Sequence, residues 1–426
     1  MTAPGNGSRP GNWSGTVDFP ARRWEQPSAD AVSALLAGDD TEIRPLGTAH
    51  SFSAIARTRG LQIATGNMDR ILSLDESGPS VLVEPGVTYA ALGEWLHARG
   101  WALSNLASLP HLSVGGAVAT GTHGSGDRNG SLATAVLELE IALPGGGVVR
   151  LNRDEHPDVF PGAVVSLGAL GVVRSLRLRI VPTFTVRQTV YEDLSLDAYL
   201  WHFDDIHRSA YSVSVFTDWS PGTVAQVWRK CVVSDPVIGD RLFGAPAAPR
   251  NLHPIRSMDA SRCTPQMGEE GPWHLRLPHF LPEFAPSHGD EIQSEYFVPR
   301  VLAPSAIEAV AAIGPRLQDL LWISEIRTVA ADDLWMSPAC NQDVVGIHFT
   351  WRRDPERVSA LLATVEELLA PYGARPHWGK VFRIDPSPCA RHESFRALAL
   401  RFDPERRMRN AFLDRILERG TGFVGL

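Results

Sequence analysis

Six glycines lie within residues 115–130 of this chain, at Gly115, Gly116, Gly121, Gly124, Gly126 and Gly130. Glycine lets backbone N–H groups crowd around an anion, so this stretch predicts a phosphate cradle. Residues 124–130 nearly match a Rossmann fingerprint, but a Rossmann loop opens a helix. Residues 134–143 are instead rich in β-forming side chains, and the absence of any lysine before Lys230 also excludes a P-loop. The apolar residues at 114 and 117–119 make this a loop that we expect to be shielded from solvent.

The charge balance and the apolar pattern exclude several classes of partner. The 426 residues include 40 basic and 48 acidic side chains, a formal net charge of −8, without basic runs. This argues against a nucleic-acid groove and against a membrane-surface patch. No apolar run approaches the ~18 residues needed to span a bilayer, so no membrane contact is expected. Residues 1–13 are polar and lack the apolar core of a signal peptide, which predicts a cytoplasmic protein.

Cysteine and lysine usage add two further expectations. Cys231, Cys263, Cys340 and Cys389 lie far apart and form no CxxC pair. This spacing supports neither a zinc site nor a disulfide-rich scaffold, and we expect no bound metal. Lys230 and Lys380 are the only lysines in the chain.

At ~150 residues per domain, the length predicts two or three domains.

The first 185 residues alternate between signals for short strands and signals for short helices. Ser28 is expected to cap a helix that buries Val32, Leu35 and Leu36, and Thr88 to cap a second helix that ends near Gly100. Strands are expected at 42–46 and 80–84, with a second glycine-containing loop at 47–51 and a hairpin around 144–147.

Residues 234–288 have no clear periodicity and contain nine prolines between Pro236 and Pro286. Trp273, His274, Phe280 and Phe284 favour an ordered covering loop over a solvated linker. Beyond this segment we expect strands at 292–298, 321–329 and 344–351, with helices near 304–319 and 355–370.

Several separate motifs, taken together, resemble one family. Residues 46–52, 106–111 and 114–124 resemble the vanillyl-alcohol-oxidase type of FAD enzyme, and within it the alditol (xylitol) oxidases and their aldonolactone-oxidising relatives. The resemblance extends over nearly the whole chain and also includes residues 13–15, 166–171, 293–296, 325–327 and 375–380.

The resemblance implies that two backbone loops hold the FAD pyrophosphate and that His50 is joined covalently to the flavin 8α-methyl group. The family commonly has glycine immediately before the linking histidine, whereas this chain has Ala49. Alanine fits there without strain only if φ is negative. The implied cofactor contacts are Pro45, Leu46, Gly47, Thr48, Ala49, His50, Ser51, Ser108, Ser113, Gly116, Thr120, Gly121, Thr122, His123, Val173 and His377.

The C-terminal half contains most of the implied substrate residues. The period of two along a strand places Glu325 and Arg327 on one face, and likewise His348 and Thr350, with residues 347, 349 and 351 on the opposite face. A polyol requires both donors and acceptors, and Ser108, Glu325, Arg327, Thr350 and Lys380 provide them. Arg327 and Lys380 are suited to stabilising developing alkoxide charge. His348 and a deprotonated Lys380 are both candidates for the proton acceptor.

Together these features predict a two-domain α+β chain with the vanillyl-alcohol-oxidase (PCMH-type) FAD-binding fold. The expected FAD-binding domain is residues 1–184, the substrate domain is 185–383, and residues 384–426 return to the first domain. We expect a monomer that oxidises the terminal hydroxyl of an alditol with O₂ as acceptor, forming hydrogen peroxide. The alternatives are an aldonolactone oxidoreductase of the same fold and a flavin- or sugar-binding protein without turnover. Lys230 lies outside every motif, and its replacement is expected to change little.

Overall fold

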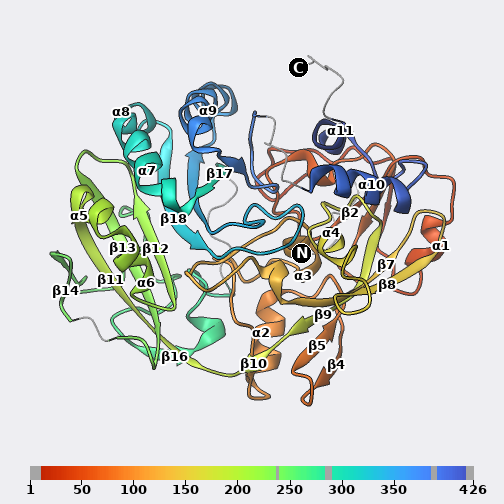
Figure 1. Cartoon of the computed structure of the whole chain (residues 1–426), viewed down its shortest axis with the longest axis horizontal. Helices are drawn as coiled ribbons and strands as arrows, with labels where there is room; N and C mark the ends of the chain where they lie inside the picture. Colours follow the sequence, from red (N-terminus) through yellow and green to blue (C-terminus); the bar gives the residue numbers. More distant parts are fainter. Residues whose placement is uncertain (1–10, 237–238, 284–289, 385–390, 419–426) are drawn as a thin grey trace.

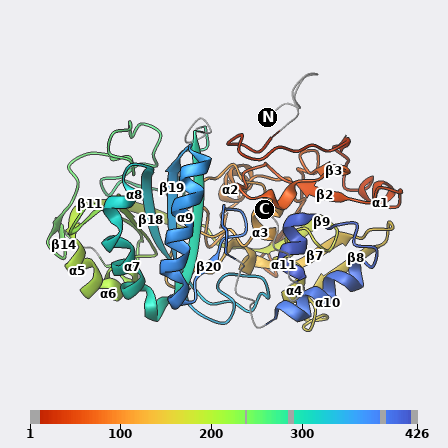
Figure 2. The same cartoon turned by 90° about the horizontal axis from the view of Figure 1, so that it is seen from above.

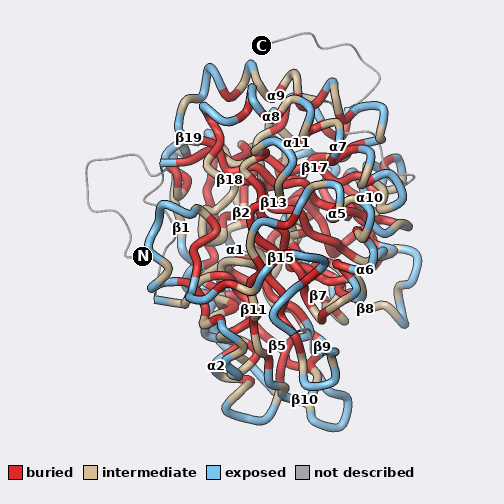
Figure 3. Tube along the Cα trace, turned by 90° about the vertical axis from the view of Figure 1, so that its left-hand side faces the viewer, coloured by how far each residue is buried: buried red, intermediate tan, exposed pale blue. Residues whose placement is uncertain are grey.

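Two large antiparallel sheets form the two halves of the molecule (Figure 1). The computed structural model describes residues 11–236, 239–283, 290–384 and 391–418. A five-stranded sheet belongs to the N-terminal half and an eight-stranded sheet to the half that follows, and helices pack on both (Figure 2). Figure 3 shows the buried residues concentrated along these strands, with exposed residues in the peripheral turns. None of the described helices is long and apolar enough to cross a membrane.

The N-terminal half begins with a small parallel sheet. Its strands, in spatial order, are β1 (Arg23–Glu25), β3 (Leu61–Ala64) and β2 (Ile43–Leu46), with helix α1 (Val32–Leu36) beside them. The strand expected at 42–46 is thus confirmed as β2. The expected Ser28 cap is wrong, because α1 begins after Ala31 without a side-chain cap. Ser28 instead closes a turn in which its carbonyl accepts a hydrogen bond from the Ala31 amide.

The five-stranded sheet has the order β4-β5-β9-β7-β8, and all its pairs are antiparallel. The hairpin expected around residues 144–147 joins β7 to β8, and the Thr88 hydroxyl caps helix α2 by accepting from the Ala91 amide. Gly100 follows this helix with φ +78°, a conformation that glycine adopts without strain. The elements are β4 (Ile71–Asp75), β5 (Ser80–Val83), α2 (Tyr89–His97), β6 (Trp101–Ala102), β7 (Val136–Ala142), β8 (Val148–Asn152), α4 (Phe160–Val164), β9 (Val172–Arg179) and β10 (Val181–Pro182).

The glycine-rich stretch departs from its expected loop conformation. Its first part is a short helix, α3 (Val114–Ala119), with Val114, Ala117 and Val118 buried in the core. The apolar spacing that marked this stretch as shielded is therefore helical spacing. Gly115 and Gly116 do not prevent the helix, because burial of its apolar side compensates for their low helix propensity. After α3 the chain does continue into strand β7, as the β-rich residues predicted.

The second half is built on the eight-stranded sheet. Its strands in spatial order are β16 (Glu270–Pro272), β11 (Thr185–Ser195), β13 (Thr223–Val232), β12 (Ser212–Thr217), β18 (Leu321–Val329), β19 (Val344–Arg352), β17 (Glu291–Pro299) and β20 (Arg375–Pro376). The strands expected at 292–298, 321–329 and 344–351 are confirmed as β17, β18 and β19. Helices α5 (Leu196–Trp201) and α6 (Phe203–Arg208) lie between β11 and β12 along the chain.

Helices α7 (Ala303–Ala312), α8 (Gly314–Leu317) and α9 (Pro355–Leu369) cover one face of this sheet (Figure 1). The expected single helix at 304–319 is thus two helices. The break lies at Ile313, immediately before Gly314 and Pro315, a pair that disfavours a continuous helix. Ile347, Phe349 and Trp351 alternate along β19 and are fully buried, so residues 348 and 350 face the other way.

The proline-rich segment packs against the edge of the same sheet. It contributes β14 (Arg241–Leu242), β15 (Ala245–Pro246) and β16, which pairs with β11. Trp273 is fully buried, and Phe280 packs against a cluster around Trp228. Phe284 lies outside the described residues.

The C-terminal helices α10 (His392–Phe402) and α11 (Ala411–Leu417) pack on the N-terminal half (Figure 2). Met408 joins the apolar cluster around α1 and β2. The Asn410 amide donates to the backbone carbonyl oxygens of Ala54 and Arg57, at 3.1 and 2.8 Å. Cys231, Cys263 and Cys340 are buried, and Cys389 lies outside the described residues.

Candidate active site

One cavity of about 470 Å³ lies between the two halves, because its lining residues come from both. Nearly every residue singled out in the sequence contributes to its lining. These residues are Pro45, Leu46, Gly47, Thr48, Ala49, His50, Ser51, Ser108, Gly116, Thr120, Thr122, His123, Val173, Glu325, Arg327, His348, Thr350, His377 and Lys380. Ser113 and Gly121 are not among the lining residues, and Ser113 lies directly behind them.

The loop at 47–51 and helix α3 approach each other too closely for larger side chains. A Cβ atom on Gly47 would lie 2.3 Å from the Ser113 hydroxyl oxygen and 3.4 Å from the Cα atom of Gly116. The Ser113 amide donates to the Thr48 hydroxyl at 3.3 Å. Two backbone segments that are far apart in sequence therefore form one continuous surface of the cavity. Such a glycine-lined surface exposes the backbone N–H groups that an anion such as a pyrophosphate requires.

Ala49 does not meet the condition of a negative φ, because its φ is +58°. The left-handed conformation brings its Cβ close to the following backbone and costs an L-residue roughly 1–2 kcal/mol. A hydrogen bond from the Trp13 amide to the Ala49 carbonyl, at 2.8 Å, helps to hold the loop in place. The loop thus keeps a geometry suited to glycine although alanine is present.

His50 is enclosed by aromatic rings. Its ring stacks on Trp13 with centroids 5.6 Å apart and lies 4.7 Å from the His111 ring. Neither imidazole nitrogen makes a hydrogen bond among the described residues. Burial, reinforced by His111, lowers the pKa of His50 to about 3, so the ring is neutral at pH 7. A buried neutral imidazole with free nitrogens retains a lone pair for bonding to a group in the cavity.

Glu325 and Arg327 share one face of β18, as the strand period predicted. The Arg327 Nε atom lies 3.5 Å from Glu325 Oε2, and its other nitrogens donate to Ser108 Oγ at 3.3 Å and to Glu295 Oε1 at 2.9 Å. All three charged groups are nearly excluded from solvent. Burial opposes ionisation of Glu325, but Arg327 and His279 together lower its pKa well below the usual range. The site therefore holds ionised groups of both signs.

Lys380 and His348 meet at one side chain of β17. The Lys380 ammonium contacts Gln293 Oε1, and His348 Nε2 lies 3.3 Å from the same oxygen. Lys380 also lies over the Phe52 ring, 5.4 Å from its centroid. Burial lowers the pKa of Lys380 to about 8 and that of His348 to about 3. At pH 7 the site therefore contains a mostly protonated lysine beside a neutral imidazole.

Two residues of this polar cluster were not identified as site residues from the sequence. Glu295 is fully buried on β17, and its Oε1 accepts from His123 Nε2 at 3.1 Å as well as from Arg327. It lies within the motif 293–296, so the family resemblance included Glu295 but assigned it no role. His279, from the proline-rich segment, lines the cavity and lies 2.7 Å from Glu325 Oε1. No motif marks His279, because its position depends on how the segment packs.

Lys230 lies outside every sequence motif, yet the structure places it next to the site. Lys230 is 1% exposed, and its Nζ atom lies 3.0 Å from His279 Nδ1, so it is one residue removed from Glu325. Strand β13 directs this side chain inward, beneath the turn that contains His279. The contact could not be predicted from the sequence, because residues 230 and 279 come together only in the folded chain.

His123, Glu295 and His377 are the described residues that come closest to a metal-binding set. Their potential ligand atoms all lie within 4.8 Å of one another. The same Glu295 oxygen already accepts from the Arg327 guanidinium, whose positive charge would repel a cation. The expected absence of a metal stays a prediction.

Comparisons with known proteins agree with this arrangement. The FAD binding domain family model matches residues 28–152, and the D-arabinono-1,4-lactone oxidase family model matches residues 290–416. An alditol oxidase from a Streptomyces species is 41% identical over 414 residues, covering 96% of this chain and 98% of that protein. An L-gulono-1,4-lactone dehydrogenase from Mycobacterium tuberculosis is 28% identical, covering 95% and 98%, respectively.

Among solved structures, a cholesterol oxidase from B. sterolicum has a TM-score of 0.73 at 16% identity and covers 96% of both chains. A solvent-stable cholesterol oxidase has a TM-score of 0.74 at 15% identity, covering 95% of this chain and 96% of that chain. At these identities the likeness concerns the fold alone. It agrees with the FAD-binding fold expected from the sequence.

Replacing Ala49 with glycine is expected to stabilise the protein. Glycine relieves the left-handed strain of roughly 1–2 kcal/mol, partly offset by its greater unfolded-state entropy of about 0.5–1 kcal/mol. Chemical denaturation should therefore show Ala49→Gly to be up to about 1.5 kcal/mol more stable. Ala360→Gly is the matched control, because Ala360 is exposed within helix α9, where glycine is less favourable than alanine and should reduce stability. Equal losses in both variants would contradict the argument.

Proposed function

The chain belongs to the vanillyl-alcohol-oxidase type of FAD-linked oxidoreductases, and on this basis we propose that it oxidises the terminal hydroxyl of alditols such as xylitol and sorbitol. The products would be the aldose and hydrogen peroxide, with O₂ as the electron acceptor. The observation that supports this most directly is the polar set on one side of the cavity, which combines a carboxylate, a guanidinium, hydroxyls and an ammonium. A polyol needs such a mixture, because each of its hydroxyls both donates and accepts.

The residues present fit FAD, the cofactor of this family. The surface formed by Gly47 and Gly116 leaves no room for a Cβ atom on Gly47, which suits close approach of a pyrophosphate to the backbone. His50, buried with two free nitrogens beside Trp13, suits the covalent link to the flavin 8α-methyl group. When bound, FAD supplies the hydride acceptor that no side chain can provide.

The side chains would bind and orient the substrate. Glu325 accepts from a substrate hydroxyl, whereas Arg327, Thr350 and Ser108 can donate to others. Lys380 is placed to stabilise negative charge on the reacting oxygen, because it is a mostly protonated cation in a partly water-excluded cavity. Neutral His348 and a deprotonated Lys380 both remain candidates for the proton acceptor.

An aldonolactone oxidoreductase is the second candidate function. The match of residues 290–416 to the D-arabinono-1,4-lactone oxidase model favours it, since these residues include most of the substrate side of the cavity. A lactone is cyclic and carries fewer hydroxyls than an open alditol of the same carbon number. A binding protein without turnover is opposed by the retained Glu325, Arg327 and Lys380.

We further propose the domain division 1–184, 185–383 and 384–426. Strand β10 pairs with β6 of the first half, whereas β11, which begins at Thr185, belongs to the eight-stranded sheet. The packing of α10 and α11 on the first half supports the return of the C-terminal segment. A cytoplasmic monomer stays a prediction.

A substrate panel tests the proposed activity. The protein loaded with FAD is mixed anaerobically with xylitol, sorbitol, L-gulono-1,4-lactone or buffer, and flavin bleaching is followed before air is admitted. The alditols should bleach the flavin, and air should restore its colour with formation of hydrogen peroxide. Bleaching by the lactone alone would establish the second candidate instead. A flavin that no member of the panel reduces would contradict both.

The covalent link predicts that acid precipitation leaves yellow flavin with the protein. His50→Ala should release the flavin into the supernatant, because no other nitrogen occupies this place in the loop. His202→Ala, which removes a partly exposed histidine from the other half of the molecule, is the control. Free flavin in the supernatant of the unmodified protein would rule out the link while leaving FAD binding intact.

Lys380→Met should slow anaerobic flavin reduction by about 10²–10³, the loss typical of a contact to developing oxyanion charge. Since the pKa of Lys380 is lowered to about 8, reduction of the unmodified protein should slow as pH rises above 8 and the ammonium loses its proton. Lys380→Met should lack this decrease. Arg401→Met, which removes an exposed cation on α10, should behave as the unmodified protein. A rate that instead rises through pH 8 would make the neutral amine the base.

A further inference from the structure

His279 is held rigidly although it comes from the proline-rich segment. Its backbone amide donates to the Ser108 carbonyl at 3.1 Å, and its own carbonyl accepts from the Thr264 amide at 2.9 Å. Its ring packs edge-on against Phe216 and Trp228, each with a centroid distance of 5.4 Å. In this arrangement Nε2 lies 2.7 Å from Glu325 Oε1 on β18 and 3.4 Å from Ser214 Oγ on β12, whereas Nδ1 faces Lys230 on β13.

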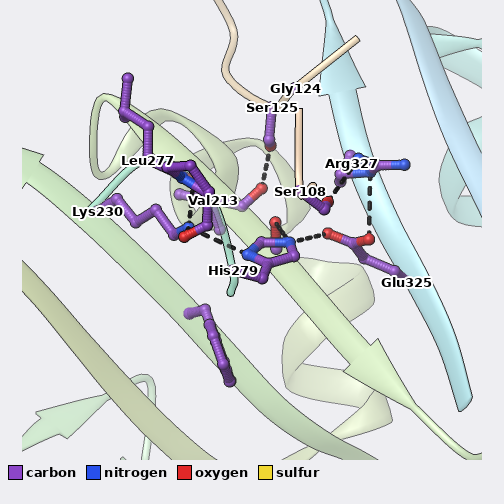
Figure 4. Close-up of polar contacts among 12 residues, drawn as sticks. Ser108, Gly124, Ser125, Val213, Lys230, Leu277, His279, Glu325 and Arg327 are labelled. Carbon is purple, nitrogen blue, oxygen red and sulfur yellow. Dashed lines mark hydrogen bonds and ion pairs between the residues drawn. The ribbon is translucent and has the colours of Figure 1, made fainter. Parts of the chain in front are cut away.

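Lys230 has three acceptors around its Nζ atom. They are the backbone carbonyls of Leu277 and Pro278 and the Nδ1 atom of His279; the last two lie at 2.9 and 3.0 Å (Figure 4). An ammonium has three N–H bonds, whereas a neutral amine has only two. The number of acceptors therefore matches the protonated form. Burial lowers the pKa of Lys230 to about 7, so below pH 7 the protonated form prevails.

The Lys230 ammonium determines which nitrogen of His279 carries hydrogen. An ammonium can only donate, so Nδ1 must accept and the hydrogen of the neutral ring must lie on Nε2. That Nε2–H points at Glu325 Oε1, 2.7 Å away (Figure 4). Burial, reinforced by Lys230, lowers the pKa of His279 to about 4, which keeps the ring neutral near pH 7.

The hydrogen bond from His279 leaves one oxygen of Glu325 for the cavity. Oε1 accepts from His279, whereas among the described residues the polar group near Oε2 is Arg327 Nε, at the longer distance of 3.5 Å. An ionised carboxylate that is held from one side presents its remaining lone pairs in a defined direction. A substrate hydroxyl in the cavity can therefore donate to Oε2 without competing with His279.

We propose that His279 is a positioning residue for substrate: fixed by Lys230, it donates Nε2–H to Glu325 and so orients the carboxylate that receives a substrate hydroxyl. This inference rests on the proposed function and adds to it a role for the proline-rich segment. The segment is then more than a cover over the sheet edge, because its residue 279 determines how well a substrate-binding carboxylate is aligned. A merely structural alternative is that His279 and Lys230 only tie the 277–279 turn to β13.

Two substitutions at one position separate these roles. In His279→Gln the side-chain amide can place an N–H near the position of Nε2, from which it can donate to Glu325. In His279→Asn the shorter side chain places its amide near the position of Nδ1, from which it reaches only Lys230. Positioning predicts that His279→Asn raises the xylitol concentration for half-maximal flavin reduction about tenfold or more, while His279→Gln changes it less than about threefold. The limiting rate and the flavin content should change little in either. The reverse order, with Asn tolerated and Gln impaired, would overturn the proposal in favour of the structural role.

A second measurement needs no substrate and no substitution at His279. Nitrogen-15 NMR of the flavin-loaded protein at pH 6 should show His279 neutral, with hydrogen on Nε2. The charged or titratable groups facing this network are Lys230 from β13, Glu325 and Arg327 from β18 and, beside Lys230, Cys263. Lys230→Met removes the cation that opposes protonation and leaves Glu325, which favours it, so the pKa of His279 should rise.

Arg250→Met is the matched control, because it removes one exposed cation from the same segment and should leave the pKa of His279 unchanged. Hydrogen on Nδ1 of the unmodified protein would overturn the proposal, as would an unchanged pKa in Lys230→Met. If no alditol reduces the unmodified protein, the proposed function fails, and the NMR result still decides the hydrogen-bond order from Lys230 to Glu325.

Discussion

The buried guanidinium of Arg327 is the group on which the arrangement of the cavity depends. It connects Glu325 on its own strand, Glu295 on β17 and the hydroxyl of Ser108 from the N-terminal half. Two carboxylates buried this close would repel each other strongly without a cation between them. Because arginine stays charged at any working pH, it stabilises both as acceptors. Removing it would leave two uncompensated buried charges, which costs far more than a surface ion pair is worth.

The same cluster joins the two halves of the molecule. Glu295 accepts from His123, which follows the glycine-rich helix α3, so the proposed cofactor side and the proposed substrate side share one carboxylate. Ser108 is tied twice to the other half, through its hydroxyl to Arg327 and through its carbonyl to the His279 amide. The cavity is therefore formed by contacts that exist only when both sheets are packed together. We infer that mutations in this cluster affect the relative placement of the halves as well as binding.

The cavity has two regions that differ in their electrostatic environment. Around His50 the surroundings are apolar and aromatic, which keeps the imidazole neutral and its nitrogens free. Around Arg327 the groups are ionised and mutually compensated. Lys380 has a character intermediate between these two regions. Burial lowers its pKa towards the physiological range, whereas the negative charge of Glu295 opposes that decrease. A group whose charge can change near neutral pH is suited to chemistry in which a hydroxyl loses a proton.

Features that depend on local pattern can be predicted from the amino-acid sequence. The period of two placed Glu325 beside Arg327, Thr88 capped its helix, and the glycines at 47 and 116 marked two backbones that approach closely. Local pattern did not predict the conformation of segments that is set by contacts with other parts of the chain. Ala49 adopts φ +58° because its loop is held from outside, and the stretch 114–119 is helical because the core buries its apolar side. Lys230 and His279 meet only through the packing of a segment without periodicity. Such contacts depend on long-range burial and hydrogen bonding, which no local spacing encodes, so only the tertiary structure could reveal them.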